Sequence, residues 1–451
     1  MRSDPTIFSL QKHNHVCVKF CVSFLLVGLA FGLLLRDSFS FSSVIQTSTP
    51  IAKEKTESSV FPFPIEVSNS FDVPGNNQNQ TSQNDIHYTD LVTEKCDIFV
   101  GEWVPDKSGP IYTNESCHEI QHHQNCMKNG RADIGYLYWR WRPRKCEIPK
   151  FNPKKFLLLM RNKSWAFIGD SISRNHVQSL LCILSQYSNL KNVEPAVEIY
   201  HDKEYRSKIW KFPSHNFTLS VIWAPFLIEA AMFEDKTGIT SSDIHLHLDK
   251  LDNKWTNQYN NFDYVVISGG KWFLKTAIYH ENNTVTGCHY CPGKNLTEQG
   301  FEYAYRKALQ QVFNFFANSN HRATVFFRTT TPDHFENGEW FSGGYCNRTV
   351  PFKEGEVDMI DADSIMRGIE LEEFEKVLSL SSVKSVNLKL MDTTLLSLLR
   401  PDGHPGPYMQ FQPFAKDKKG KVQNDCLHWC LPGPIDSWND MVMEMLVNGS
   451  Q

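Results

Sequence analysis

Short apolar runs alternate along this chain with stretches of helical spacing, and this alternation limits the folds open to it. Because buried parallel strands read as nearly continuous apolar runs, each run is typical of a central strand. The runs are Trp165–Ile168, Phe217–Trp223, Tyr264–Ser268, Ala323–Phe327 and Lys384–Leu388. The helical patterns are Ile172–Leu184, Glu302–Ala317 and Ser364–Leu380. Strands that alternate with helices build parallel βαβ units, so the sequence predicts an α/β fold with a parallel sheet flanked by helices.

A serine stands where the first of these runs meets the first helical pattern, in the triplet Gly169-Asp-Ser171. A serine at a strand-to-helix turn has an exposed hydroxyl beside the free N–H groups of the helix N-terminus. Far downstream, Asp425 and His428 are three residues apart, so one turn would let the carboxylate orient an imidazole that activates Ser171. Each motif alone is weak, because a lone Asp-x-x-His is more often a surface turn. Together they predict an acyl-transfer site.

An apolar stretch near the N-terminus, Val16–Leu35, is interrupted only by Lys19. Its length at helical rise would just cross the apolar core of a bilayer, which is about 30 Å thick. A cleaved signal peptide usually has a shorter apolar region that ends in small residues, whereas Arg36 follows here. We therefore expect an uncleaved signal anchor at residues 16–35. Basic residues gather on its N-terminal side, which predicts a cytosolic tail at 1–15 and a lumenal body.

Residues 36–93 are rich in Ser, Thr, Asn, Gln and Pro. Such a stretch cannot bury enough apolar surface to offset its ordering entropy, so we expect a flexible stem. The lumenal catalytic domain would then span residues 94–451. A net charge near −4 argues against nucleic acid as the main partner. Nothing resembles a nucleotide-binding loop, so no bound cofactor is expected.

Cysteine usage favours an oxidising compartment. Of the twelve cysteines, Cys17 and Cys21 lie in the predicted membrane segment, which leaves an even set of ten and up to five disulfides. Glycosylation sequons all follow that segment, at Asn79, Asn114, Asn162, Asn216, Asn282, Asn295, Asn347 and Asn448. The spacing of Cys288 and Cys291 would suit half a zinc site, but the sequence holds no second pair of that spacing. We expect a short-loop disulfide there and no metal.

Longer blocks around the two motifs resemble one family. Gly169-Asp-Ser-Ile-Ser-Arg-Asn-His-Val-Gln-Ser-Leu-Leu-Cys182 resembles the Gly-Asp-Ser block of the plant trichome birefringence-like family. Asp425-Cys-Leu-His-Trp-Cys-Leu-Pro-Gly-Pro-Ile-Asp-Ser-Trp438 is similar to its Asp-x-x-His block. Further matches are Cys96–Trp103, Tyr138–Pro143, Trp223–Phe226 and Asp402–Pro405. The likeness covers roughly residues 96–446.

The resemblance implies a Golgi polysaccharide O-acetyltransferase, a single-pass type II membrane protein with an SGNH/GDSL-esterase-like fold. Ser171 would be the nucleophile, His428 the general base and Asp425 its orienting partner. Gly287–Cys291 and Trp272-Phe273 are similar to the group that acetylates xyloglucan, especially its galactosyl side chains. Similar members act on mannan, so glucomannan is the alternative acceptor. An esterase that removes acetyl groups would use the same triad.

The acetyl donor is required but not identified by the resemblance: acetyl-CoA and an acetyl-supplying membrane partner both remain open. Oxyanion donors are expected from the Ser171 N–H and from Arg174, although a structural ion pair would also explain that arginine. Where many relatives have Asn-Thr-Gly-His, this chain reads Ser268-Gly-Gly-Lys271. Backbone N–H groups of Gly269 or Gly270 would have to replace the asparagine donor, because glycine lets the backbone approach a ligand closely.

Two further groups have both a functional and a structural interpretation. Trp139 and Trp141 interleave with arginines, which suits a glycan groove, but a buried strip beside Cys146 is the favoured interpretation. Asp402 and His404 would form an additional pair near the active face, or a hydrogen-bonded structural turn.

By analogy with the family's cysteine pattern, four more disulfides are expected: Cys96–Cys146, Cys117–Cys182, Cys126–Cys430 and Cys346–Cys426. The third would hold His428 near Ser171.

Overall fold

The computed structural model describes residues 96–191, 193–232, 243–379, 387–417 and 420–449. Each helix in these ranges is either too short or too polar to span a bilayer. The predicted tail, anchor and stem, residues 1–93, lie outside the described residues.

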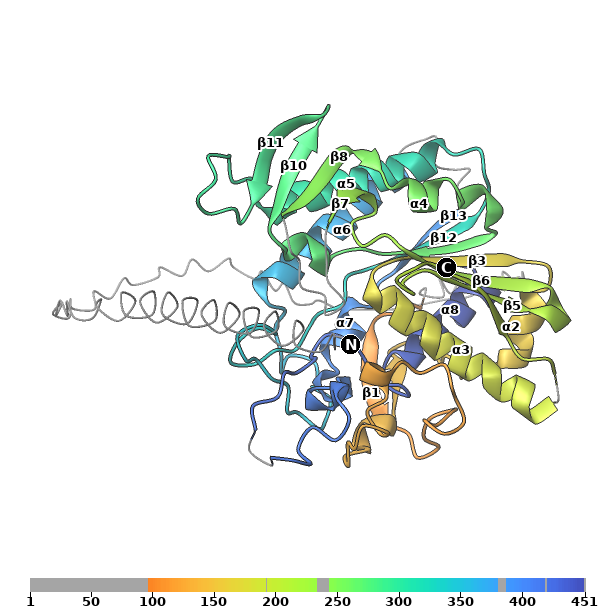
Figure 1. Ribbon diagram of the computed structural model, residues 1–451. Helices are drawn as coiled ribbons and strands as arrows, with labels where there is room; N and C mark the ends of the chain where they lie inside the picture. Colours follow the sequence, from red (N-terminus) through yellow and green to blue (C-terminus); the bar gives the residue numbers. More distant parts are fainter. Residues whose placement is uncertain (1–95, 192, 233–242, 380–386, 418–419, 450–451) are drawn as a thin grey trace, which may run out of the picture. The chain divides into compact units, whose positions relative to one another are not determined.

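A seven-stranded sheet forms the centre of the described part of the chain, in the order β13-β12-β9-β3-β6-β5-β4 (Figure 1). Five neighbouring strands run parallel: β3 (Ser164–Gly169), β6 (Phe217–Trp223), β9 (Tyr264–Ile267), β12 (Thr324–Arg328) and β13 (Asn387–Met391). The edge pair β4 (Val197–His201) and β5 (Lys208–Phe212) is antiparallel. The prediction of a purely parallel sheet is therefore wrong at this edge.

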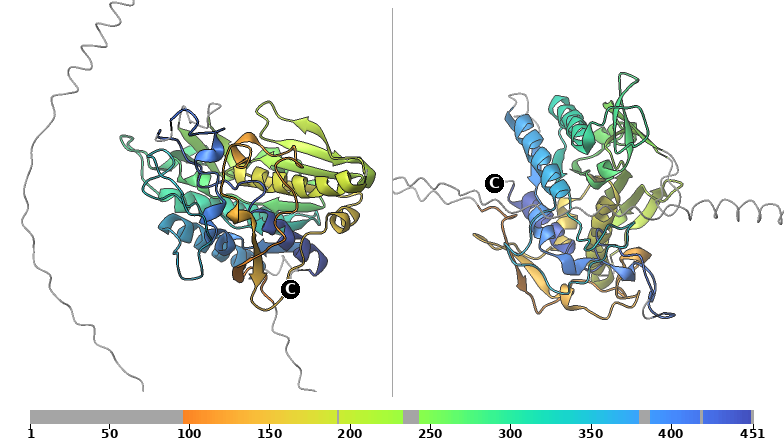
Figure 2. Two further views of the ribbon diagram at one scale, coloured as in Figure 1. Left: turned by 90° about the horizontal axis from the view of Figure 1, so that it is seen from below. Right: turned by 90° about the vertical axis from the view of Figure 1, so that its left-hand side faces the viewer.

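Helices cover both faces of the central sheet, as predicted (Figures 1 and 2). On β3, Trp165 and Phe167 pack toward one face, while Ala166 and Ile168 pack toward the other. The first face is covered by α2 (Pro153–Leu159), α3 (Ser171–Lys191) and α8 (Asp436–Val447). The second is covered by α4 (Asn253–Thr256), α5 (Gly300–Asn318) and α6 (Asp361–Ser379). A short helix, α7 (Thr394–Leu398), follows β13.

Two smaller sheets were not predicted. One has four strands in the order β11-β10-β8-β7 and packs on α5. Its members are β7 (Ile228–Ala231), β8 (Ile244–Leu251), β10 (Ala277–Glu281) and β11 (Thr284–His289). The other pairs β1 (Gly101–Pro105) with β2 (Trp139–Pro143) in antiparallel register. Five disulfides join the chain: Cys96–Cys146, Cys117–Cys182, Cys126–Cys430, Cys288–Cys291 and Cys346–Cys426.

Candidate active site

The order of the parallel strands defines where a ligand would bind. The chain fills one side of β3 with β6 and then crosses to the other side to form β9, β12 and β13. In open α/β sheets, ligands bind at the carboxyl ends of the strands, where the strand order reverses. Here the reversal lies between β3 and β9, so Ser171 and Gly270, just beyond those strand ends, lie at the expected place.

The turn before Ser171 requires a glycine. Gly169 has φ +152°, and a Cβ there would lie 2.4 Å from the Ser268 carbonyl oxygen and 2.7 Å from Ser173 Oγ. Asp170 Oδ1 accepts a 2.9 Å hydrogen bond from the Ile172 N–H, which secures the start of α3. As the first residue of α3, Ser171 has a backbone N–H that no preceding helical turn can satisfy. That N–H can stabilise developing negative charge beside the Ser171 hydroxyl.

Ser171, His428 and Asp425 form a continuous hydrogen-bonded triad. His428 Nε2 lies 2.7 Å from Ser171 Oγ, and His428 Nδ1 lies 2.8 Å from Asp425 Oδ2. Asp425 Oδ1 also accepts the backbone N–H groups of Leu427 and His428, at 3.1 and 2.9 Å. With Nδ1–H donated to the carboxylate, Nε2 keeps a lone pair for the serine proton. The structure therefore brings together the three residues that the sequence assigned to the chemistry.

The charges of the triad match these roles. Burial alone would raise the pKa of Asp425, but the charge and hydrogen bonds of His428 outweigh it and hold that pKa well below its usual range. Burial would lower the pKa of His428, and the Asp425 carboxylate overcomes this and raises it. Asp425 is thus ionised at any physiological pH, while His428 becomes an effective base only when it loses its proton.

The loop that carries His428 is fastened from several sides. Cys430 is bonded to Cys126, and Cys426 to Cys346. Asn175 lies one turn beyond Ser171 on α3, and its Oδ1 accepts the Trp429 N–H at 2.7 Å. The helix that presents the nucleophile therefore also holds the backbone beside the base.

Asp402 and His404 both make structural contacts, and those of His404 are with this loop. Asp402 is fully buried and pairs with Arg400, whose Nε and Nη2 lie 2.8 and 3.0 Å from its two carboxylate oxygens. The His404 ring stacks on Trp429 with centroids 4.3 Å apart, and its Nδ1 lies 2.7 Å from the His428 carbonyl oxygen. These contacts favour the structural alternative for both residues.

Arg174 and His123 adjoin the triad. The Arg174 guanidinium lies 4.8 Å from the Trp223 ring centroid, and its positive charge disfavours the protonated forms of both His428 and His123. The His123 ring packs edge-on against His428 at 5.8 Å. Burial first, and the neighbouring His428 second, lower the pKa of His123 to about 4, so it stays neutral. Sequence reasoning missed His123, and its only signal was its place three residues before Cys126.

The side chains of the Ser268–Lys271 segment are engaged in contacts. Ser268 Oγ lies 3.1 Å from Ser173 Oγ and accepts a hydrogen bond from Arg328 Nη2 at 2.5 Å. Lys271 pairs with Asp333 at 2.8 Å and also with Asp363. These side chains are engaged in structural contacts, which leaves backbone N–H groups as the donors that this segment can offer.

Gly270 suits such a backbone role. It has φ +147°, and a Cβ would lie 2.3 Å from Thr330 Oγ1, so a side chain would not fit. The Thr330 hydroxyl in turn lies 3.0 Å from the Gly269 carbonyl oxygen. The turn is thus fixed closely against the segment that follows β12.

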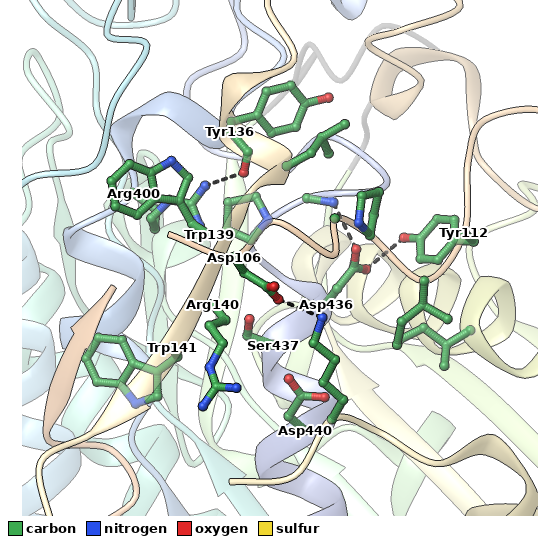
Figure 3. Close-up of a pocket in the computed structure, with 18 of the residues that line it drawn as sticks. Asp106, Tyr112, Tyr136, Trp139, Arg140, Trp141, Arg400, Asp436, Ser437 and Asp440 are labelled. Atoms are coloured by element: carbon green, nitrogen blue, oxygen red, sulfur yellow. Dashed lines mark hydrogen bonds and ion pairs between the residues drawn. The ribbon is translucent and has the colours of Figure 1, made fainter. Parts of the chain in front are cut away.

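Trp139 and Trp141 line a separate pocket (Figure 3). Trp141 is 5% exposed, donates its indole N–H to the Ile98 carbonyl oxygen at 2.9 Å, and packs edge-on against Trp103. These contacts favour a structural role for Trp141, while Trp139 is half-buried. Asp436 contributes to the pocket wall and accepts the Tyr112 hydroxyl at 2.7 Å. None of the described residues lining this pocket belongs to the triad.

The Cys288–Cys291 pair could only have bound a metal as thiolates. Both sulfurs lie near the Glu298 carboxylate, but they are joined in a disulfide. A disulfide offers no thiolate ligand, so this group does not form a zinc site.

Comparison with known proteins defines the class to which the fold and the triad belong. Residues 148–445 match the GDSL/SGNH-like acyl-esterase family found in Pmr5 and Cas1p, and residues 94–147 match the PMR5 N-terminal domain. The chain therefore belongs to this acyl-esterase family.

Individual relatives narrow the position of the chain within the family. It is 59% identical over 446 residues to Protein trichome birefringence-like 25 of Arabidopsis thaliana, and the match covers 98% of this chain and 94% of the relative. It is 44% identical to Xyloglucan O-acetyltransferase 1 of Populus trichocarpa, over 79% of this chain and 83% of the relative. Xyloglucan O-acetyltransferase 1 of Arabidopsis thaliana is also 44% identical to this chain, over 78% of the chain and 80% of the relative. The resemblance to the trichome birefringence-like proteins is confirmed.

Proposed function

We propose that this protein is an O-acetyltransferase that acetylates a plant cell-wall hemicellulose, and that its acceptor is xyloglucan, at the galactosyl side chains. The contact that carries the proposal is the 2.7 Å approach of His428 Nε2 to Ser171 Oγ, in a chain related to proteins named for xyloglucan acetylation. Glucomannan or another hemicellulose is the alternative acceptor.

The first step loads the nucleophile. Ser171 Oγ attacks the carbonyl carbon of the acetyl donor while His428 Nε2 takes the hydroxyl proton. The tetrahedral intermediate then expels the donor's leaving group, which receives that proton from His428. Negative charge on the carbonyl oxygen is stabilised by the Ser171 N–H, with Arg174 and the Gly270 N–H as further donors. Acetyl-CoA and an acetylated membrane partner would both serve as donor.

The second step regenerates the enzyme. A sugar hydroxyl gives its proton to His428 Nε2 and attacks the acetyl-serine carbonyl. Collapse of this intermediate forms the sugar ester and releases Ser171 Oγ, which recovers the proton. Throughout both steps Asp425 holds the imidazole in one orientation and stabilises its charged form.

An acetylesterase is the second candidate, because the matching family is described as an acyl-esterase family. The two functions differ only in whether a sugar hydroxyl or water attacks the acetyl-serine. An esterase would release acetate from acetylated xyloglucan without any acceptor, whereas a transferase requires one.

The decisive experiment is mass spectrometry of xyloglucan oligosaccharides after incubation with the full-length chain and an acetyl donor. The transferase proposal expects a product heavier by one acetyl group that disappears with Ser171→Ala and persists with Ser185→Ala, a control on the same helix. Free acetate without acetylated sugar would contradict transfer to xyloglucan, and the assay would then be repeated with glucomannan.

We also propose that the protein resides in the Golgi membrane, with residues 16–35 as a type II anchor and the catalytic part in the lumen. The apolar run and its basic flank support this orientation, and the five disulfides suit an oxidising compartment. Protease protection of sealed microsomes tests it, since a lumenal catalytic part would survive digestion until detergent is added.

A further inference from the structure

Three histidines gather on one face of the four-stranded sheet, away from the triad. His245 and His247 stand two apart on β8, so their side chains share a face. The neighbouring parallel strand β10 places His280 directly beside His247. Leu246 and Tyr279, which alternate with these histidines, are fully buried on the side that packs against α5. The three half-buried imidazoles therefore lie on the outer face of the sheet.

Two of the rings are close enough to share a ligand, and the third stacks on one of them. His245 Nδ1 lies 2.8 Å from His280 Nε2, and the centroids of these rings are 5.0 Å apart. The His247 ring stacks on His280 at 4.9 Å. His247 Nδ1 is buried and makes no hydrogen bond to any described residue. Glu229 on β7 is exposed and stands opposite His247, which supplies a nearby carboxylate.

We propose that His245, His247 and His280 bind one divalent transition-metal ion. Neutral imidazole nitrogens are preferred ligands of zinc, copper and nickel, and three histidines with one open position form a recurrent zinc arrangement. The sheet supplies three such imidazoles on one face, because two of the histidines stand on β8 and the third on the neighbouring strand β10.

Binding one ion would require a small separation of two nitrogens and a reorientation of the third ring. Two nitrogens bound tetrahedrally to zinc at about 2.0–2.1 Å lie about 3.3 Å apart. The His245 and His280 nitrogens would therefore separate by roughly 0.5 Å as the ion replaces the proton that they share. His247 would turn about its Cβ–Cγ bond to direct Nδ1 toward the same point, and Glu229 or water would complete the coordination.

Such an ion would join β8 to β10 on the outer side of this sheet. Strand β10 begins seven residues after Gly270, so the ion would also restrain the segment that leaves the active face. The histidines lie outside the residues assigned to acyl transfer, so the metal site stands independently of the proposed function.

The test is a competition titration of the full-length, disulfide-bonded chain with Zn²⁺ against a chromophoric chelator. We expect one Zn²⁺ per chain, and a loss of at least about tenfold in affinity in each of His245→Ala and His280→Ala. His201→Ala is the control, because His201 is an exposed histidine on a strand outside this sheet, β4. It should leave affinity unchanged. Zn²⁺ should raise the midpoint of thermal unfolding of the wild-type chain and of His201→Ala only.

Either of two results would overturn the proposal: no stoichiometric Zn²⁺ binding at micromolar concentrations, or binding that persists in both cluster variants. Circular dichroism in metal-free buffer shows whether the variants are folded. If an alanine variant is not, His247→Gln replaces it, because a glutamine retains polar bulk at that position but removes the imidazole. Visible absorption of the Co²⁺-loaded chain provides an independent signature, which must also disappear in the cluster variants.

Discussion

Glu370 on α6 makes a sharp prediction about stability, because its carboxylate is completely buried. Its Oε1 accepts the Thr330 N–H at 2.8 Å and lies 2.5 Å from the hydroxyls of both Thr330 and Tyr305. Those hydroxyls also lie 3.0 and 3.4 Å from the Gly269 carbonyl oxygen. Each hydroxyl has a single proton, so a hydroxyl that donates to Glu370 cannot also donate to Gly269. A protonated Glu370 can donate its own proton to one of them, and that hydroxyl is then free to donate to Gly269 and fix the turn at the active face.

Because the pKa of Glu370 is higher in the folded state than in the unfolded state, the free energy of unfolding depends on pH. Burial raises the pKa from 4.5 to about 7, against the smaller lowering effect of the hydrogen bonds from Thr330 and Tyr305. The folded state therefore retains the proton over a range in which the unfolded state has lost it. This contribution is fully present below pH 4.5 and is lost as the pH rises through about 7. At 1.36 kcal/mol per pH unit, the loss is about 3 kcal/mol.

Glu370→Gln tests this reasoning, because an amide fills the same space and cannot ionise. Urea unfolding of the full-length chain should give free energies for variant and wild type that differ little at pH 4.5. At pH 8 the wild type should have lost about 3 kcal/mol of unfolding free energy that the variant keeps. The difference between variant and wild type should therefore be larger at pH 8 than at pH 4.5 by about 3 kcal/mol, in favour of the variant. The control is Glu372→Gln on the same helix, where the pair with Arg306 is solvent-exposed and should change stability by less than about 1 kcal/mol. If the effect of Glu370→Gln is the same at both pH values, the raised pKa is refuted.

Three further perturbations follow from the site. Asp425→Asn should reduce kcat/KM about 10⁴-fold and move the acid limb of the pH–rate profile to lower pH, because the carboxylate no longer raises the pKa of His428. Replacing Cys126 and Cys430 together by alanine should lower the free energy of unfolding by about 2–5 kcal/mol in urea titrations and reduce acetyl transfer. Arg174→Gln should lower kcat about 10²–10³-fold in steady-state kinetics if the guanidinium stabilises the oxyanion.

Each of these has its own control. Asp358→Asn removes an exposed carboxylate and should leave activity close to that of the wild type. If Asp425→Asn also keeps activity within tenfold of the wild type, the triad assignment is contradicted. Removal of the Cys288–Cys291 disulfide, which spans 3 residues rather than 304, should cost less stability than removal of Cys126–Cys430. Arg161→Gln changes an exposed arginine, and an equal loss there would exclude a specific role for Arg174.

The central sheet could be predicted because its strands are buried on both faces. Phe217–Trp223 was predicted with the bounds that β6 has, since its apolar residues are nearly continuous. Strand β8 was missed because Ile244-His-Leu-His-Leu alternates apolar and polar residues, as a half-buried strand does. The predicted strand Lys384–Leu388 overlaps β13, which covers Asn387–Met391, and its first three residues lie outside the described residues. Strand β4 is exposed along its whole length and gave no apolar signal.

The residues of the site that lie in local sequence motifs could be predicted, whereas those placed by long-range contacts could not. Ser171 was visible in its strand-to-helix context, and Asp425 and His428 in their spacing. Asn175 was not, because its contact with Trp429 joins residues 254 positions apart and leaves no local pattern. His123 depends likewise on the fold, which packs its ring against His428. Such contacts follow from tertiary packing, which periodicity and spacing cannot report.

The stability that the buried carboxyls contribute and the activity of the catalytic base respond to pH in opposite directions. Burial raises the pKa of Asp436 to about 6 and of Asp440 to about 7, so these groups, like Glu370, favour the folded state at acidic pH. His428 needs the reverse, since it accepts the Ser171 proton only after losing its own, and Asp425 raises the pKa at which that happens. Acetyl transfer should therefore rise with pH while the stability that these carboxyls contribute falls. Buried histidines with lowered pKa values, such as His123 and His176, act in the opposite sense, so the carboxyl contribution is measured as the difference between wild type and Glu370→Gln. If transfer did not rise from pH 5 to 8, the base would have been misassigned, and if that stability difference did not change over the same range, the buried carboxyl would have been.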